Sequence, residues 1–199
     1  MTLEVGIQIT GVILTFLGLS LIWYQIRSAR QDSMTSSFIS AVADHWMLIE
    51  DRRMQIRSGE MKVSYRLLPP HLEKLLSTEY QGNLATLAKD FLYHAEGDQL
   101  IGLVTQGKDN VFEEIIKEYA YEDLIFNLYE EEFTTGKYLH LVNKKLWDYW
   151  ESYMKQGFQS SVRQNHWRLR QVVGKTFPEF AKFVEQQCLG NTPHKINHA

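Results

Sequence analysis

A run of 22 residues without a charged side chain, from Val5 to Ile26, most constrains what this chain can fold into. As an α-helix the run would measure about 33 Å, enough to cross the hydrocarbon core of a bilayer. A buried core helix is the alternative, but such helices rarely stay uncharged on every face for this length. Trp23 and Tyr24 stand where interfacial aromatic residues are expected. The run therefore predicts a transmembrane helix within residues 1–27.

The charges on either side of the run predict its orientation. Glu4 precedes it, whereas Arg27 and Arg30 follow it. Cytoplasmic flanks are enriched in Lys and Arg, so we expect the bulk of the chain in the cytoplasm, anchored in the inner (cytoplasmic) membrane by a single pass. A cleaved signal peptide is not expected, because no Lys or Arg precedes the run and no small-x-small pattern follows it. Four residues are predicted interfacial anchors: Trp23, Tyr24, Arg27 and Arg30.

Polar and small residues within the run fall on one face of the predicted helix. We name this face the helix seam, and its residues recur at spacings of three and four: Gln8, Gly11, Thr15, Gly18, Ile22 and Gln25. Small residues let helices approach closely in lipid, and glutamine hydrogen bonds across such a contact contribute about 0.5–2 kcal/mol. The seam predicts a homo-oligomer. A lone anchor with both glutamines at headgroup level is the alternative.

The remaining residues have the composition of one folded domain. Of 199 residues, 44% are hydrophobic and 23% charged, with only four prolines. A net charge of -3 and the lack of any Lys/Arg-rich run give no sign of nucleic-acid binding. Cys188 is the only cysteine, so no intramolecular disulfide can form.

Helix signals divide this domain. The polar stretch 31–37 contains neither Gly nor Pro, so the anchor can continue as a rigid stalk into a helix at 35–57 that ends at Ser58 and Gly59. Pro69 and Pro70 predict an extended turn before a short helix from His71.

Glycines predict a loop at 97–107. Asn110 with Glu113 predicts a capping box that opens a central, buried helix. Further helices are expected at 84–95, 110–134, 138–156, 160–173 and 178–189.

The predicted fold class is all-α, with one N-terminal transmembrane helix followed by a cytoplasmic helical bundle. We divide the chain into an anchor (1–27), a stalk with the first helix of the soluble part (28–57), the bundle (58–190) and a flexible tail (191–199).

Candidate chemical groups are few. Glu122 and Asp123 interrupt an apolar stretch, and since buried carboxylates need partners we expect an ion pair with Arg52, Arg53 or Arg168. The run 130–132 is expected to be a solvated helix end. Asp90 and His94 share one helix face, but no second such pair accompanies them, so neither a metal nor a cofactor is predicted. Cys188 shows no sign of activation.

One pair of residues has a spacing used by nucleases. Helical RNases of the HEPN kind carry Arg and His separated by four to six residues, and Arg66 with His71 is the pair here with that spacing. The intervening Leu-Leu-Pro-Pro departs from the family, in which these residues open a helix. A membrane-bound RNase is therefore only an alternative.

The order of one span, a polar stalk and a bundle containing YEDLIFNLYEEEF (121–133) and LWDYWESYMKQGF (146–158) resembles a family of small bacterial membrane-anchored helical proteins. More faintly, it resembles accessory membrane-pore proteins of RNA-guided RNase CRISPR systems. These resemblances cover the architecture and residues 110–188, and the second implies oligomeric pore formation in antiviral (phage) defence.

We therefore expect a non-enzymatic, membrane-anchored helical effector or regulator that self-associates, with a pore as its most specific form. Its expected partners are the lipid bilayer, further copies of the chain and a cytoplasmic protein. A monomeric tether that docks a cytoplasmic partner is the first alternative.

Overall fold

The computed structural model describes the backbone of residues 3–62, 65–139, 142–174 and 176–190, and side chains from Leu19 onward except Gln31. These residues form helices and no strand, which confirms the all-α class. In chain order the helices are α1 (Leu3–Ser58), α2 (Leu68–Thr78), α3 (Leu84–Phe91), α4 (Gly97–Gln106), α5 (Lys108–Phe133), the π-helical turn η1 (Thr134–Tyr138), α6 (Lys144–Gly157), α7 (Ser161–Val173), α8 (Pro178–Phe183) and the π-helical turn η2 (Val184–Cys188). The predicted tail, 191–199, lies outside the described residues.

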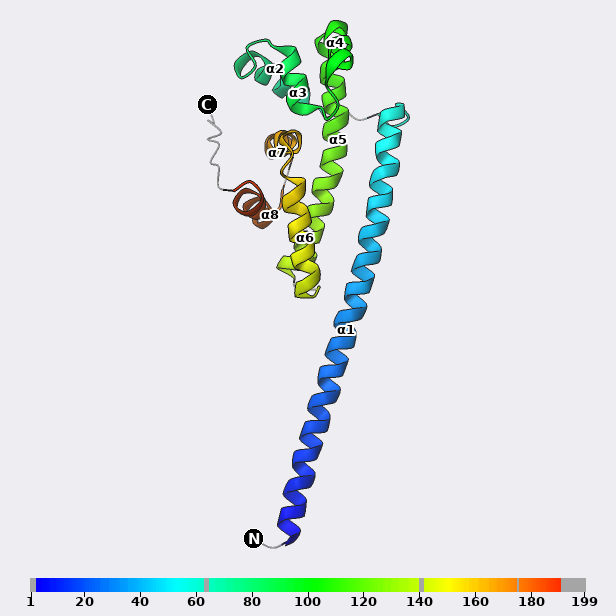
Figure 1. Cartoon of the computed structure of the whole chain (residues 1–199), viewed down its shortest axis with the longest axis vertical. Coiled ribbons are helices and arrows are strands. Elements are labelled where there is room, and N and C mark those ends of the chain that lie inside the picture. The colour runs from blue at the N-terminus through cyan, green and yellow to red at the C-terminus, as the bar shows by residue number, and fades with distance from the viewer. Residues whose placement is uncertain (1–2, 63–64, 140–141, 175, 191–199) are drawn as a thin grey trace.

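Helix α1 is a single rod of 56 residues. At 1.5 Å per residue it measures about 84 Å. Its C-terminal half lies beside the bundle, while its N-terminal half projects well beyond it (Figure 1). The absence of Gly and Pro from 31–37 lets the helix run on unbroken, as predicted. It ends at Gly59, whose positive φ of 78° favours glycine.

The bundle packs against one face of α1. Val42, Ile49 and Ile56 are buried there, at a spacing of seven residues that brings them to the same side. The partner element is α5. His45 Nδ1 of α1 lies 3.2 Å from Glu131 Oε2 of α5.

Helix α5 is the centre of the domain, as predicted from its apolar residues on several faces. Its C-terminal half packs into one apolar cluster with α6, α7 and α8, where Phe126 and Tyr129 are fully buried. Its N-terminal half packs into a second cluster with α2, α3 and α4, around Ile115. One helix therefore connects both parts of the core.

The predicted loop at 97–107 was wrong, because this segment is helix α4. Gly97 (φ 54°) and Gly107 (φ 104°) stand at its two ends, where left-handed backbone is needed, and only Gly102 lies inside. Leu100 is buried and contributes to the core. Packing of the apolar residues outweighed the helix-breaking tendency of glycine.

Three predicted helix starts also differ. Helix α6 begins at Lys144 and not at residue 138, because Tyr138 ends the π-helical turn η1. Helix α5 begins at Lys108, so Asn110 lies inside its first turn and donates from Nδ2 to the Gln106 carbonyl at 3.0 Å instead of forming a capping box. Pro69 and Pro70 occupy the first turn of α2, where a missing N–H is tolerated, rather than an extended turn. The predicted helix 84–95 ends early, at Phe91.

Side-chain caps fix the starts of two later helices. Asn143 Oδ1 accepts from the Leu146 N–H at 2.9 Å before α6, and Ser160 Oγ accepts from the Arg163 N–H at 3.4 Å before α7.

Within the described part of the chain, no helix combines the length and the apolar content needed to cross a membrane. The side chains of residues 3–18 lie outside that part.

Candidate functional site

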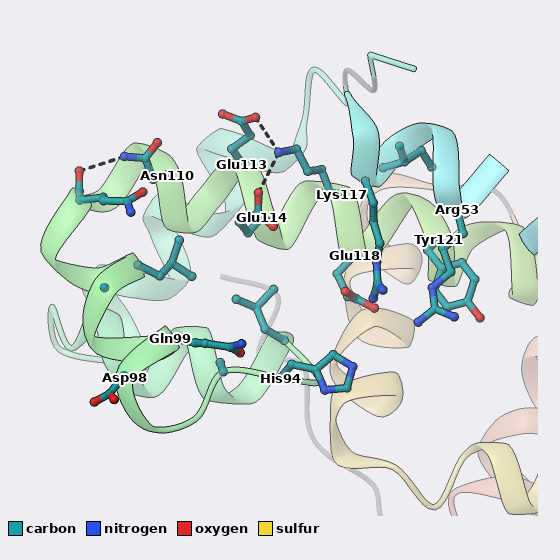
Figure 2. Close-up of a pocket in the computed structure, with 17 residues that line it drawn as sticks. Arg53, His94, Asp98, Gln99, Asn110, Glu113, Glu114, Lys117, Glu118 and Tyr121 are labelled. Atoms are coloured by element: carbon teal, nitrogen blue, oxygen red, sulfur yellow. Dashed lines mark hydrogen bonds and ion pairs between the residues drawn. The ribbon is translucent and has the colours of Figure 1, made fainter. Parts of the chain in front are cut away.

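A cleft with a volume of about 1010 Å³ opens between the end of α1, the loop before α4, helix α4 and the N-terminal half of α5 (Figure 2). Its lining includes the apolar residues Ile56, Leu92 and Ala95. Polar side chains from three separate parts of the chain converge on this space. Pockets of this size can hold a small-molecule ligand.

Two arginines of α1 line one end of the cleft, and they are one helical turn apart. The guanidinium of Arg53 lies 4.4 Å from the centre of the Tyr121 ring. Its Nη1 lies 3.4 Å from Glu50 Oε2, but its buried Nε has no hydrogen-bond partner among the described residues. Arg57 is exposed along the cleft wall. This end therefore offers unused cationic donors.

Glu118 of α5 faces the same end (Figure 2). Its Oε1 is buried and has no hydrogen-bond partner among the described residues. Burial raises the pKa of this carboxyl, and the nearby charges of Arg57, Arg53 and His94 act in the opposite direction. One unpaired carboxyl thus lies within electrostatic range of three basic side chains.

The opposite end of the cleft is acidic. Lys117 Nζ is held by two carboxylates, Glu113 at 2.9 Å and Glu114 at 2.7 Å. Asp98 adds a further carboxylate from α4 (Figure 2). The cleft is therefore polarised, with its available basic groups near α1.

The sequence prediction missed this cleft. Arg53 and Arg57 carry the signal of a shared helix face at i and i+4, but nothing in the sequence brings α4 beside them.

Glu122 and Asp123 are paired, as predicted, but the predicted arginines were wrong. Glu122 is fully buried and accepts from Arg163 Nε at 2.7 Å, Arg163 Nη2 at 3.1 Å and the Tyr93 hydroxyl at 2.8 Å. Arg170 Nη1 donates to Asp123 Oδ1 at 2.6 Å. Both arginines belong to α7. The packing of α7 against α5 places them beside the two carboxylates, in place of the predicted Arg52, Arg53 and Arg168.

Arg170 also binds two further residues of α5. Its Nη2 donates to Glu130 Oε2 at 2.7 Å and to Asn127 Oδ1 at 2.9 Å. Glu130 Oε1 in turn accepts from the Phe177 N–H at 2.7 Å. This network joins α5, α7 and the segment before α8, and each of its charged groups has a hydrogen-bond partner, which indicates a structural role.

The expected solvated helix end at 130–132 was wrong. Glu130 is bound to Arg170, and Glu132 is only 1% exposed. Neither carboxylate oxygen of Glu132 has a hydrogen-bond partner among the described residues. Burial raises the pKa of Glu132 to about 8, and Glu131 adds to the shift. Glu132 is therefore protonated over a wide pH range.

The described residues hold no group of three or more His, Cys, Asp or Glu side chains suited to a metal ion. Asp90 Oδ2 accepts from the Tyr80 hydroxyl at 2.8 Å, and His94 lies in the loop after α3, so the expected shared helix face does not form. Burial raises the pKa of the Cys188 thiol to about 12, which keeps it unreactive.

The predicted seam and anchors lie on the projecting half of α1. The side chains of Gln8, Gly11, Thr15 and Gly18 lie outside the described residues. Ile22 and Gln25 are exposed, as are all four predicted interfacial anchors: Trp23, Tyr24, Arg27 and Arg30. The Arg27 guanidinium lies 5.3 Å from the centre of the Trp23 ring.

Arg66 and His71 lie at the start of α2. Arg66 is exposed in the preceding turn, and His71 is half-buried. The residues between them do open a helix, so the departure from the nuclease pattern that the prolines predicted is not observed. No interaction joins the two side chains among those of the described residues. Burial, followed by the charge of Lys74, lowers the pKa of His71.

The chain matches no family model, no curated protein and no solved structure. The resemblances drawn from the sequence therefore stay predictions, and the functional argument rests on the residues themselves.

Proposed function

We propose that this protein is a membrane-anchored helical effector or regulator that self-associates through α1. The observation that carries the proposal is the projecting half of α1. It stands clear of the bundle (Figure 1), and five of its apolar side chains are each more than 50% exposed: Leu19, Leu21, Ile22, Trp23 and Ile26. Exposed apolar residues in such a group mark a surface that another phase or molecule covers.

A lipid bilayer is the environment that best accounts for the exposed apolar side chains of this segment. The exposed residues continue an uncharged sequence that begins at Val5, and they include positions on several sides of the helix. Arg27 and Arg30 then follow directly, where cationic side chains would meet the cytoplasmic headgroups. A protein partner would cover one face of the helix more readily than all of them.

Self-association is the second part of the proposal, and the helix seam supports it. Small and polar residues on one face favour close contact with another helix in lipid. A wider ring would turn the same face toward a water-filled lumen, which is the pore form of the proposal. A monomeric tether docking a cytoplasmic partner is the alternative.

Flotation of the full chain with liposomes tests the anchor. The wild type should float, and Leu14→Arg with Leu17→Arg should remain at the bottom of the gradient, because each central arginine costs about 2.5–3.5 kcal/mol to insert. Leu14→Ile with Leu17→Ile is the matched control and should float. If the wild type stays in the aqueous phase as a stable oligomer, α1 is a soluble helical assembly and the anchor is wrong.

Mass measurement in detergent tests self-association. If the protein is a monomer at every usable concentration, self-association is wrong and the monomeric tether is the remaining proposal. Dye leakage from liposomes, recorded beside the mass, separates a pore from a closed oligomer. If Thr15 faces a lumen, Thr15→Leu should still form the oligomer but conduct less. If Thr15 lies in a tight helix contact, the same change should weaken oligomer formation. Absence of leakage from wild-type oligomers would rule against the pore form.

A further inference from the structure

The cleft at the C-terminal end of α1 is lined by two side chains that each have a polar atom without a hydrogen-bond partner among the described residues. Arg53 Nε and Glu118 Oε1 are both buried and both lack a partner among the described residues. Unpaired buried polar groups are unfavourable, and natural proteins retain few of them without a reason such as a bound ligand. One is a donor and the other an acceptor, and both belong to side chains that line the cleft (Figure 2).

We propose that this cleft binds a small organic anion that also carries hydroxyl groups, such as a sugar phosphate. The anionic group lies at Arg53 and Arg57, and a ligand hydroxyl donates to Glu118. The guanidinium groups suit phosphate or carboxylate, because their planar donors match those oxygens. A volume of about 1010 Å³ is far more than a free phosphate ion fills.

The opposite end of the cleft sets the charge distribution of the ligand. Glu113 and Glu114 already hold Lys117, so this lysine is not a free cation. Asp98 of α4 adds negative charge across the cleft from Glu113 and Glu114 (Figure 2). A second anionic group would be repelled there, whereas hydroxyl groups would find acceptors. The ligand is therefore charged at one end and neutral at the other.

The position of the cleft favours a soluble ligand over a lipid headgroup. Arg53 lies 27 residues after Ile26, which corresponds to about 40 Å along a straight helix. The cleft is lined by the C-terminal end of α1, which lies far from the N-terminus of that helix (Figure 1). Because Arg53 and Arg57 belong to the helix that projects from the bundle, a bound ligand would contact that helix directly. The binding inference itself does not depend on the membrane proposal.

Titration calorimetry of the full chain in detergent micelles tests the proposal with three probes: ribose 5-phosphate, inorganic phosphate and ribose. Ribose 5-phosphate should bind most tightly. Arg57→Gln should weaken its binding about tenfold, the effect of losing one charged hydrogen bond. Arg168→Gln is the matched control, because Arg168 is exposed on α7 and makes the same change in charge. It should leave the affinity unchanged.

Glu118→Gln tests the hydroxyl contact separately. It should reduce the preference for ribose 5-phosphate over inorganic phosphate while phosphate binding persists. Neither Arg57 nor Glu118 makes a side-chain hydrogen bond to another described residue, so melting temperatures should confirm that both variants are folded. The proposal is overturned if the wild type binds none of the probes, or if Arg57→Gln and Arg168→Gln weaken binding equally. An unchanged preference in Glu118→Gln would overturn the role of that carboxyl.

Discussion

Arg163 of α7 donates two hydrogen bonds, of 2.7 and 3.1 Å, to the carboxylate of Glu122 of α5. Glu122 is fully buried, and the Arg163 side chain is 15% exposed. The two residues are 41 positions apart in the sequence, and the pair joins α5 to α7. Its removal should affect the whole domain.

Glu122→Gln should lower the free energy of unfolding by about 3–5 kcal/mol, because it leaves the Arg163 charge buried without its partner. Replacing both residues, with Glu122→Leu and Arg163→Met, should recover most of that loss. Chemical denaturation of the three proteins measures the effect. Glu113→Gln is the control, since Glu113 is exposed and its loss should have little effect. A single variant as stable as the wild type would show that the pair contributes nothing.

Glu132 should make stability fall as pH rises. Burial raises the folded-state pKa of this carboxyl to about 8 from a reference value of 4.5. The folded state therefore binds its proton more strongly than the unfolded state between these values, and the stabilisation present below pH 4.5 is lost as pH rises through 8. The loss amounts to about 5 kcal/mol.

Glu132→Gln should remove this dependence and be more stable than the wild type at pH 9. Unfolding by denaturant across pH 5–9 provides the measurement. Glu185→Gln is the matched control, because Glu185 is exposed and does not contribute to the pKa shift of Glu132, so this variant should keep the wild-type slope. Parallel slopes for wild type and Glu132→Gln would mean that Glu132 has a charge partner in solution.

Gly136 should not tolerate a side chain. A Cβ added there would lie 2.7 Å from Trp147 Cε3 and 3.3 Å from Val142 Cγ2. Gly136→Ala should therefore lower the free energy of unfolding by about 1–3 kcal/mol through overpacking. Gly102→Ala, inside α4 with open space around its Cβ, should instead raise it by about 1 kcal/mol. Equal effects in thermal unfolding would contradict the close contact at Trp147.

The two tryptophans of α6 should contribute differently to the stability of the domain. Trp147 is buried, packs against Phe133 and Phe183, and donates to Glu151 at 2.7 Å. Trp147→Ala should cost about 3–5 kcal/mol in stability. Trp150 is half-buried, and its indole N–H has no partner among the described residues, so Trp150→Ala should cost less. Melting temperatures decide this, and a larger effect at Trp150 would reverse the assignment.

Orientation is tested with reporters fused after Ala199. The bias of Arg27 and Arg30 against Glu4 predicts activity from a cytoplasmic reporter and none from a periplasmic one. Periplasmic activity would overturn the predicted topology.

Local signals in the sequence predicted most of the helices. The end of α1 at Ser58 follows from Gly59, and the start of α7 follows from the cap at Ser160, because each depends on the conformation of a few adjacent residues. The central position of α5 followed from its apolar residues on several faces. The same reasoning failed at α4, where the packing of Leu100 outweighed three glycines.

The all-α class, the continuity of α1 across 31–37 and the need of Glu122 and Asp123 for partners all follow from the amino-acid sequence. The packed fold was needed to show that those partners are Arg163 and Arg170, that Glu132 is buried, and that Arg53 and Glu118 line one cleft. Helical periodicity specifies which residues share a face of one helix. It does not specify how far each helix is rotated and shifted against its neighbours, which is settled by packing the whole core at once.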